Sequence, residues 1–511
     1  MSTKSRVIKN TAFLYIRTVA SLLLGIFTTR FLLEGLGAED FGIYNVVGGA
    51  ISMLGFLSAS LGSSTQRFIS YAQGEGRQER ILKIFNNALL IHNALAAISV
   101  IILIIAGFFF FNGILNIPDG KFADAIFVYG CLLLTTVFSI TVAPYEAAIN
   151  AHENMLFYSV VGVIDVLLKF GIALGLLYCD GDKLIIYTVL MSAEALAMRL
   201  ASQIYCRHKY DECRRTNILR YREKSVIREM LSFTGWNMTN ICTGMVSLFG
   251  MNLIINHYFG VELNAAMGIA TQLSGILMGM SENMIKAITP VLIKSEGGRQ
   301  RDRMLSVSLI GCKFSFLLFA FFGIPVMFYI APVLDLWLTV IPPWSVSFCV
   351  IMIANALLNQ MTVLLYQSIS AEGNVRVYNI ARSISNIVPL FVSIVMIAAF
   401  DFNPNWILIN WLVWKSIVGG AINVYYCHKN LGMEYGAFMR DVFVPGLALV
   451  LSSSVLYLCS THIGGSLHVN PFVSLSVAII LSIPLYYGLA LTSRQKSDIK
   501  SLIRKRIPSC R

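Results

Sequence analysis

Charged side chains inside long apolar stretches are the residues of this sequence best suited to chemistry. Nine basic residues fall within such stretches: Arg17, Arg30, Arg67, Lys169, Arg199, Lys286, Lys313, Arg382 and Lys415. An arginine at the centre of a membrane costs at least about 2.5–3.5 kcal/mol on insertion scales, so a membrane-embedded charge calls for a partner or a water-filled cavity. Cationic groups of this kind suit the binding of phosphate groups.

Arg17 lies on a polar stripe of an otherwise apolar helix. At helical spacing it shares a face with Thr18, Ser21, Gly25 and Thr28. A stripe of this composition is not suited to face lipid, so the pattern favours a cavity-lining arginine. Pairing with a buried carboxylate is the alternative.

Arg30 and Arg67 fall near the ends of their apolar stretches. Long basic side chains at such positions can reach the lipid headgroups, so snorkelling competes with substrate binding for both.

Two acid–base pairs have a spacing of four residues, namely Asp165 with Lys169 and Glu282 with Lys286. Neighbours at this spacing on a helix form ion pairs, which is the simpler interpretation. Because such pairs can exchange partners when an anionic ligand arrives, Lys169 and Lys286 are candidate substrate ligands. Asp165 and Glu282 are candidate sites for a coupling cation, either sodium or a proton.

The composition requires that these residues sit in a membrane. Of 511 residues, 56% are hydrophobic and 13% are charged, and the mean hydropathy is +0.71. Such a chain is too apolar for a soluble protein and predicts an all-α protein with many membrane spans. The net charge of +12 is therefore assigned to cytoplasmic loops and headgroup contacts rather than to nucleic acid. The ten cysteines occur singly, which predicts neither a disulfide framework nor a metal site, and nothing indicates a cofactor.

Apolar stretches long enough to cross a bilayer number about 14. They cover residues 10–33, 41–72, 84–111, 122–150, 155–178, 184–206, 227–256, 263–294, 304–331, 344–370, 375–400, 406–428, 442–462 and 471–492. With a cytoplasmic N-terminus, the inside segments hold 28 basic residues and the outside loops hold only Lys121 and Lys183. The positive-inside rule therefore predicts that both termini are cytoplasmic.

Internal similarity predicts that a six-span unit is duplicated. An offset of 223 residues aligns Gly37 with Gly260, and an offset of 220 aligns residues 149–158 with 369–378. Asn240 then takes the place of Arg17, and we expect both to line one polar interior, as in transporters built from parallel repeats. The predicted organisation is a lobe at 1–206, a basic cytoplasmic linker at 207–226, a second lobe at 227–428, two further helices at 429–492 and a basic tail at 493–511.

Three stretches resemble a known family. They are "SRVIKNTAFLYIRTVASLLLGIFTTRFLLEGLGAEDFGIYNVVGG", "SSTQRFISYAQGEG" and "APYEAAINAHENM". All three are similar to O-antigen and polysaccharide flippases of the Wzx type, in the multidrug/oligosaccharidyl-lipid/polysaccharide (MOP) exporter superfamily. The likeness runs from the first span to the last.

The resemblance implies two six-helix lobes around a central cationic cavity, two peripheral helices and alternating access. It further implies that a monomer in the bacterial inner membrane moves an undecaprenyl-pyrophosphate-linked oligosaccharide between leaflets for surface polysaccharide biosynthesis. The family's cavity arginines correspond to Arg17 and, less directly, to Arg30 and Arg67.

Two other functions remain open. A multidrug antiporter of the same superfamily would need a buried carboxylate, which Asp165 or Glu282 could supply. An integral-membrane glycosyltransferase or polymerase would need an acidic site, for which Glu39 and Asp40 are the nearest match. The outside loops are too short to build such a site, so the sequence favours a transporter over an enzyme.

Overall fold

The computed structural model describes residues 3–52, 55–114, 120–338, 340–399, 403–490 and Lys496, and within these ranges the secondary structure is helical with no strand. The first half contains α1 (Thr3–Ser52), α2 (Gly55–Glu75), α3 (Gln78–Phe109), α4 (Phe122–Ala151), α5 (Met155–Gly175), α6 (Lys183–Lys209), α7 (Asp211–Arg214), α8 (Ile218–Tyr221) and α9 (Lys224–Phe259). The second half contains α10 (Val261–Gly297), α11 (Arg301–Phe328), α12 (Ile330–Trp337), α13 (Ser345–Gln360), α14 (Val363–Glu372), α15 (Arg376–Ala399), α16 (Asn405–Leu412), α17 (Gly419–Leu431), α18 (Tyr435–Phe438), α19 (Val444–Ser466) and α20 (Pro471–Leu485). Short π-helical segments lie at Phe110–Ile114, Val413–Val418, Met439–Phe443 and Tyr486–Ala490.

The helices confirm the predicted all-α membrane class. Among the described residues, 12 helices are long and apolar enough to cross a membrane, and α13 with α14, bent by 43°, make a thirteenth if counted as one span. The remaining predicted span, 41–72, is divided between α2 and the part of α1 that follows Gly37. Gly37 has φ 77°, a left-handed conformation that interrupts the helix and that glycine adopts without steric cost.

Left-handed backbone positions recur at the offsets of the sequence repeat. Gly37 and Gly260 have φ values of 77° and 86°, and Gly76 and Arg299 have values of 72° and 57°. At the other offset, Glu153 and Gly373 have values of 58° and 102°. The two halves therefore turn at equivalent points of the chain, including points where no glycine is present.

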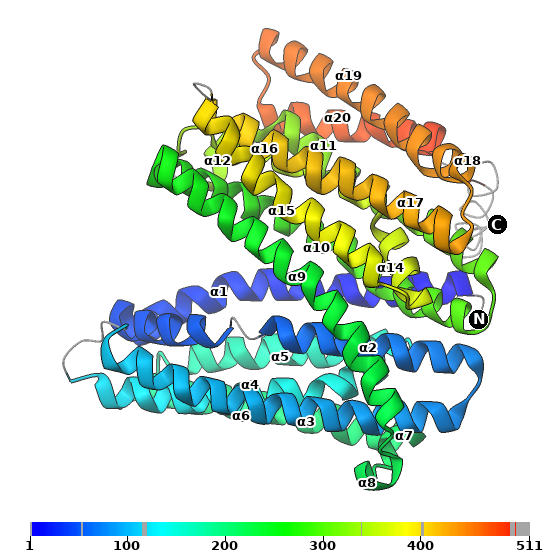
Figure 1. Ribbon diagram of the computed structural model, residues 1–511. Helices are drawn as coiled ribbons and strands as arrows, with labels where there is room; N and C mark the ends of the chain where they lie inside the picture. The colour runs from blue at the N-terminus through cyan, green and yellow to red at the C-terminus, as the bar shows by residue number, and fades with distance from the viewer. Residues whose placement is uncertain are drawn as a thin grey trace, which may run out of the picture. The chain divides into compact units, whose positions relative to one another are not determined.

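The described helices form two compact units (Figure 1). The first unit comprises Met1–Ile241, Lys286–Arg301 and Ser370–Arg376, and the second comprises Cys242–Ile285, Asp302–Ile369 and Val377–Arg511. In the first unit, α3, α4, α5 and α6 run alongside one another, and α1 packs along α5 (Figure 1).

Small residues allow the close helix packing of the first unit. Its buried side chains include Ala72, Ala88, Ala125, Ala148 and Ala173, each with 0% exposure. Apolar surface gains little by moving from lipid to protein, so membrane helices associate through such close contacts rather than through the hydrophobic effect. The result is a tightly packed helical frame around a polar cavity.

Candidate functional site

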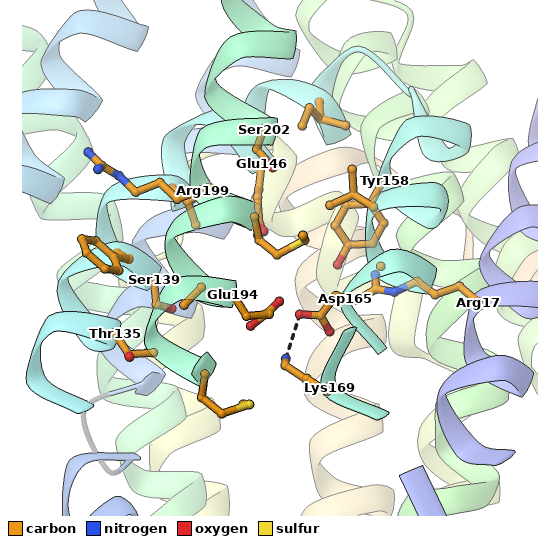
Figure 2. Close-up of a pocket in the computed structure, with 18 of the residues that line it drawn as sticks. Arg17, Thr135, Ser139, Glu146, Tyr158, Asp165, Lys169, Glu194, Arg199 and Ser202 are labelled. Carbon is orange, nitrogen blue, oxygen red and sulfur yellow. Dashed lines mark ion pairs between the residues drawn. The ribbon is translucent and has the colours of Figure 1, made fainter. Parts of the chain in front are cut away.

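A polar cavity of about 300 Å³ lies among α1, α4, α5 and α6, within the first unit (Figure 2). We call it the first-unit cavity. Its charged lining residues are Arg17, Glu146, Asp165, Lys169, Glu194 and Arg199, and its hydroxyl-bearing lining residues are Tyr44, Thr135, Ser139, Tyr158 and Ser202. The lining therefore carries three basic and three acidic side chains, where the family resemblance implied a cationic cavity.

Arg17 reaches this cavity by crossing from α1 to α5. Its guanidinium carbon lies 4.4 Å from the centre of the Tyr158 ring. A Cβ atom placed on Gly162 would lie 2.1 Å from Arg17 Nε, so only glycine leaves room for the arginine at this point. Tyr158 and Gly162 are four residues apart on one face of α5, so the Arg17 side chain packs against both of them.

Lys286 of α10 is not one of the residues that line the first-unit cavity, but it contacts the same tyrosine. Its Nζ donates a hydrogen bond of 2.5 Å to the Tyr158 hydroxyl and lies 3.7 Å from the ring centre. Within the described residues, neither Lys286 nor Arg17 forms a direct ion pair, but the carboxylate of Glu146, which also lines the cavity, interacts electrostatically with both. Two cations therefore converge on one aromatic ring, where attraction to its π-electrons offsets part of their mutual repulsion.

A carboxylate cluster lies in the same cavity, and Figure 2 shows Asp165 between Arg17 and Glu194. Asp165 forms an ion pair of 2.7 Å with Lys169, as their spacing predicts. Figure 2 shows Glu194 of α6 directed at Asp165. Glu194 is 6% exposed, and its Oε1 has no hydrogen-bond partner among the described residues. A buried, unpartnered carboxylate oxygen beside a second carboxylate suits the capture of a proton or a cation.

Arg67 contacts backbone carbonyls and aromatic rings and does not line the first-unit cavity. It is 6% exposed, and its guanidinium donates to the carbonyl oxygens of Ser370 at 3.2 Å and Ala371 at 2.9 Å. Its guanidinium carbon also lies 4.7 Å from the centre of the Phe68 ring and 5.0 Å from that of Phe233. These contacts fix residues 370–371 against α2.

The other predicted site residues lie apart from the cavity lining. Arg30 is exposed on α1, Asn240 is half-buried on α9, and Glu282 is exposed in the part of α10 that belongs to the second unit. The expected pairing of Lys286 with Glu282 is replaced by the hydrogen bond to Tyr158.

Sequence reasoning did not single out Tyr158 and Gly162 as site residues. Their signal was present as a tyrosine followed four residues later by a glycine, but it becomes meaningful only once α1 is known to pack on α5. Glu194 and Arg199 were visible as charges in an apolar stretch, without evidence of what they faced.

The second unit holds a separate pair of basic residues. Arg382 donates a hydrogen bond of 3.3 Å to the carbonyl oxygen of Lys415, and a Cβ atom on Gly419 would collide with the Arg382 guanidinium. Lys415 lies in the π-helical segment Val413–Val418, 4.2 Å from the centre of the Trp411 ring. Such π-helical turns are frequent at functional sites.

The sequence matches no protein-family model and none of the curated proteins. Solved structures do match. A MATE protein in its straight conformation has a TM-score of 0.72 at 14% identity, covering 84% of this chain and 97% of that one. An outward-facing multidrug resistance MATE family transporter of the MOP superfamily has a TM-score of 0.73 at 13% identity, covering 84% and 96%.

The chain has the fold of the MATE transporters. A third structure with this fold is a MOP superfamily transporter from Pyrococcus furiosus, with a TM-score of 0.72, 12% identity and coverage of 84% and 96%. For that protein, reverse polarity of the binding pocket suggests a different function.

Proposed function

We propose that the protein is a secondary transporter that moves a pyrophosphate-linked, isoprenoid-anchored oligosaccharide from the inner to the outer leaflet of the bacterial cytoplasmic membrane. The MATE-type fold supports transport, and the two cations that meet at Tyr158, Arg17 and Lys286, support an anionic headgroup as cargo. We further propose that both termini are cytoplasmic and that a monomer is sufficient.

The observation that carries this proposal is the convergence of Arg17 and Lys286 on Tyr158. Both distances are measured to one ring centre, so the two charges lie no further apart than the sum of 4.4 Å and 3.7 Å. A pyrophosphate group can span this separation and accept hydrogen bonds from both cations. An arginine fork and a lysine ammonium are the donors that suit phosphate oxygens.

Hydroxyl groups elsewhere in the first-unit cavity offer contacts for sugars. Thr135, Ser139 and Ser202 line the same cavity, and the Thr135 hydroxyl lies 3.2 Å from that of Ser192. Short hydroxyl side chains can both donate and accept hydrogen bonds, which suits the hydroxyls of an oligosaccharide.

Asp165 and Glu194 are proposed to couple transport to a sodium ion or a proton. A cation captured by these carboxylates would compete with Lys169 for Asp165, and the freed Lys169 could then contact the anionic substrate. Glu282, Asn240 and Arg30 are proposed to act at other stages, because they lie outside the cavity lining.

A multidrug antiporter is the second candidate. It is favoured by the three carboxylates of the first-unit cavity, which could hold an organic cation as well as a coupling ion. Arg17 and Lys286 oppose this assignment because they would repel such a substrate.

Transport by the purified full-length protein in proteoliposomes distinguishes the two. The probes are a fluorescent polyprenyl-pyrophosphate oligosaccharide, scored by access of a membrane-impermeant quencher, and a fluorescent organic cation. We expect the wild-type protein to move the lipid probe. Arg17→Gln and Lys286→Gln should each slow transport by about tenfold or more, because each variant loses one charge-assisted hydrogen bond to the substrate. Transport of the organic cation alone, abolished by Asp165→Asn and preserved in Arg17→Gln, would establish the antiporter instead.

A further inference from the structure

A second cavity of about 420 Å³ lies at the C-terminal end of α6, within the first unit. Helices α3, α4 and α6 form its walls, and the segment that carries α7 and α8 closes it. Its lining residues are Leu89, Asn93, Thr141, Tyr145, Arg199, Gln203, Arg207, Thr216, Asn217, Ile218 and Leu219. We call it the linker cavity. Its volume falls within the range of about 300–1,000 Å³ typical of small-ligand sites.

Two buried asparagines of α3 hold the linker in place. Asn86 Oδ1 accepts a hydrogen bond of 2.8 Å from the backbone N–H of Asn217. Asn87 Nδ2 donates to the carbonyl oxygen of Tyr221 at 2.9 Å, and its Oδ1 accepts from the N–H of Glu223 at 3.1 Å. Both asparagines are at most 1% exposed. The wall formed by the linker is therefore a fixed part of the first unit.

The charged residues that line this cavity are all basic. Arg199 and Arg207 lie two turns apart on one face of α6, with Gln203 between them. Arg199 also lines the first-unit cavity, so it lies between the two cavities. No carboxylate belongs to the lining. The Arg199 Nε atom is buried and has no hydrogen-bond partner among the described residues. A buried donor without an acceptor costs free energy that an anion in the cavity would recover.

Two of the three acidic residues of the linker are bound elsewhere, and the third, Asp211, is exposed and does not line the cavity. Glu212 forms a contact of 2.6 Å with His152, and Glu223 forms an ion pair of 3.2 Å with Lys83. Hydrogen bonds from Ser225 and Lys83 lower the pKa of Glu223, which keeps its charge engaged away from the cavity.

One apolar side chain is exposed among the polar lining residues Asn93, Arg207 and Asn217. Leu219, on α8, is 87% exposed, and it lies beside the half-buried Ile218. An exposed leucine in the same lining as two arginines makes the site amphiphilic. A free inorganic anion would bind the arginines but would not cover the leucine.

We propose that the linker cavity binds the headgroup of an anionic glycerophospholipid of the cytoplasmic leaflet. Arg199 and Arg207 hold the phosphate, the polar side chains of Gln203 and Asn217 face the glycerol, and Leu219 packs on the first part of an acyl chain. Basic pockets between transmembrane helices on the cytoplasmic side are suited to such headgroups.

Lipid binding to the delipidated full-length protein tests this site. The probe is phosphatidylglycerol, compared with phosphatidylcholine of the same chain length, and the readouts are lipid retained in native mass spectrometry and the lipid-induced rise in Tm. We expect Arg199→Gln/Arg207→Gln to weaken phosphatidylglycerol binding by about tenfold or more. The matched control is Arg220→Gln/Arg222→Gln, which removes two charges from the same linker outside the cavity and should bind as the wild type does.

A single substitution, Arg207→Glu, tests the same site without altering a buried group, because Arg207 is exposed. It should also abolish the preference for phosphatidylglycerol over phosphatidylcholine while leaving the lipid-free Tm unchanged. Wild-type binding by either cavity variant, or an equal loss in the control, would overturn the proposal. Displacement of the lipid by inorganic phosphate at equal concentration would show a free-anion site and would also overturn it.

Discussion

Gly162 provides the space in which Arg17 lies, which makes it a sensitive probe of the proposed substrate site. Gly162→Ala would place a methyl carbon 2.1 Å from Arg17 Nε and must move the arginine. Because the displaced atoms end a flexible side chain, we expect folding to survive and transport of the pyrophosphate lipid to fall about tenfold or more. The measurements are proteoliposome transport and Tm.

Gly171→Ala is the matched control for this substitution. Gly171 lies on the same helix, and a Cβ atom there would meet nothing within 4 Å. Alanine is favoured over glycine inside a helix by about 0.5–1 kcal/mol, so this variant should be at least as stable as the wild type and fully active. Equal transport activity of the two variants would show that the position of Arg17 does not matter for substrate binding.

Tyr158 connects the two cations and can be tested in two steps. Tyr158→Phe keeps the ring that Arg17 and Lys286 contact but removes the hydroxyl that accepts from Lys286. Tyr158→Leu removes both interactions. We expect transport to be partly reduced in the first variant and lost in the second, because a cation–π contact is worth about 0.5–2 kcal/mol. Full activity of Tyr158→Leu would show that the tyrosine does not position these cations.

Residue spacing predicted some of these contacts and missed others for a physical reason. The Asp165–Lys169 pair depends only on helix geometry, so a sequence suffices to find it. The pairing of Lys286 with Tyr158 joins residues 128 apart and depends on how α10 meets α5. Tertiary contacts decided against the local pairing with Glu282.

At the scale of elements, the close approach of α2 and the end of α10 depends on two glycines. A Cβ atom on Gly74 would lie 2.2 Å from the carbonyl oxygen of Lys294, and one on Gly297 would lie 2.1 Å from that of Tyr71. These contacts involve backbone, which cannot rotate away. Nearby, Lys294 Nζ forms an ion pair of 2.7 Å with Glu153.

Gly297→Ala should therefore destabilise this arrangement. Overpacking of this kind costs about 1–3 kcal/mol, so we expect a lower Tm and stronger maleimide labelling of a cysteine introduced at Ser295, which is 5% exposed. Gly279→Ala on the same helix is the control, since a Cβ atom there meets nothing within 4 Å. Unchanged Tm and labelling in Gly297→Ala would show that the close contact between α2 and the end of α10 does not contribute to stability.

For the whole molecule, hydropathy located the spans because the lipid environment imposes the same length on each of them. Hydropathy could not divide the spans between the two units. Two short pieces of the later chain, Lys286–Arg301 and Ser370–Arg376, belong to the first unit. The left-handed positions at Glu153 and Gly373 support a duplicated ancestor more directly than the residue identities do, because they show the same turn with different side chains.

The placement of loops relative to the membrane is the last prediction, and it rests on the distribution of charge. With both termini inside, Asp180 faces outward, whereas Arg77, Arg215 and Arg299 face the cytoplasm, and all four residues are exposed. Each position is tested with a single introduced cysteine and an impermeant maleimide, in a background where all ten native cysteines are replaced by alanine. The label at Asp180 should react in intact cells, and the other three only after permeabilisation. Asp119 and Asp401, which lie outside the described residues, should behave like Asp180. Labelling of the cysteine at position 215 in intact cells would mean that an odd number of spans precedes the basic linker. That result would contradict both the parallel orientation of the two repeats and the cytoplasmic position of the linker cavity.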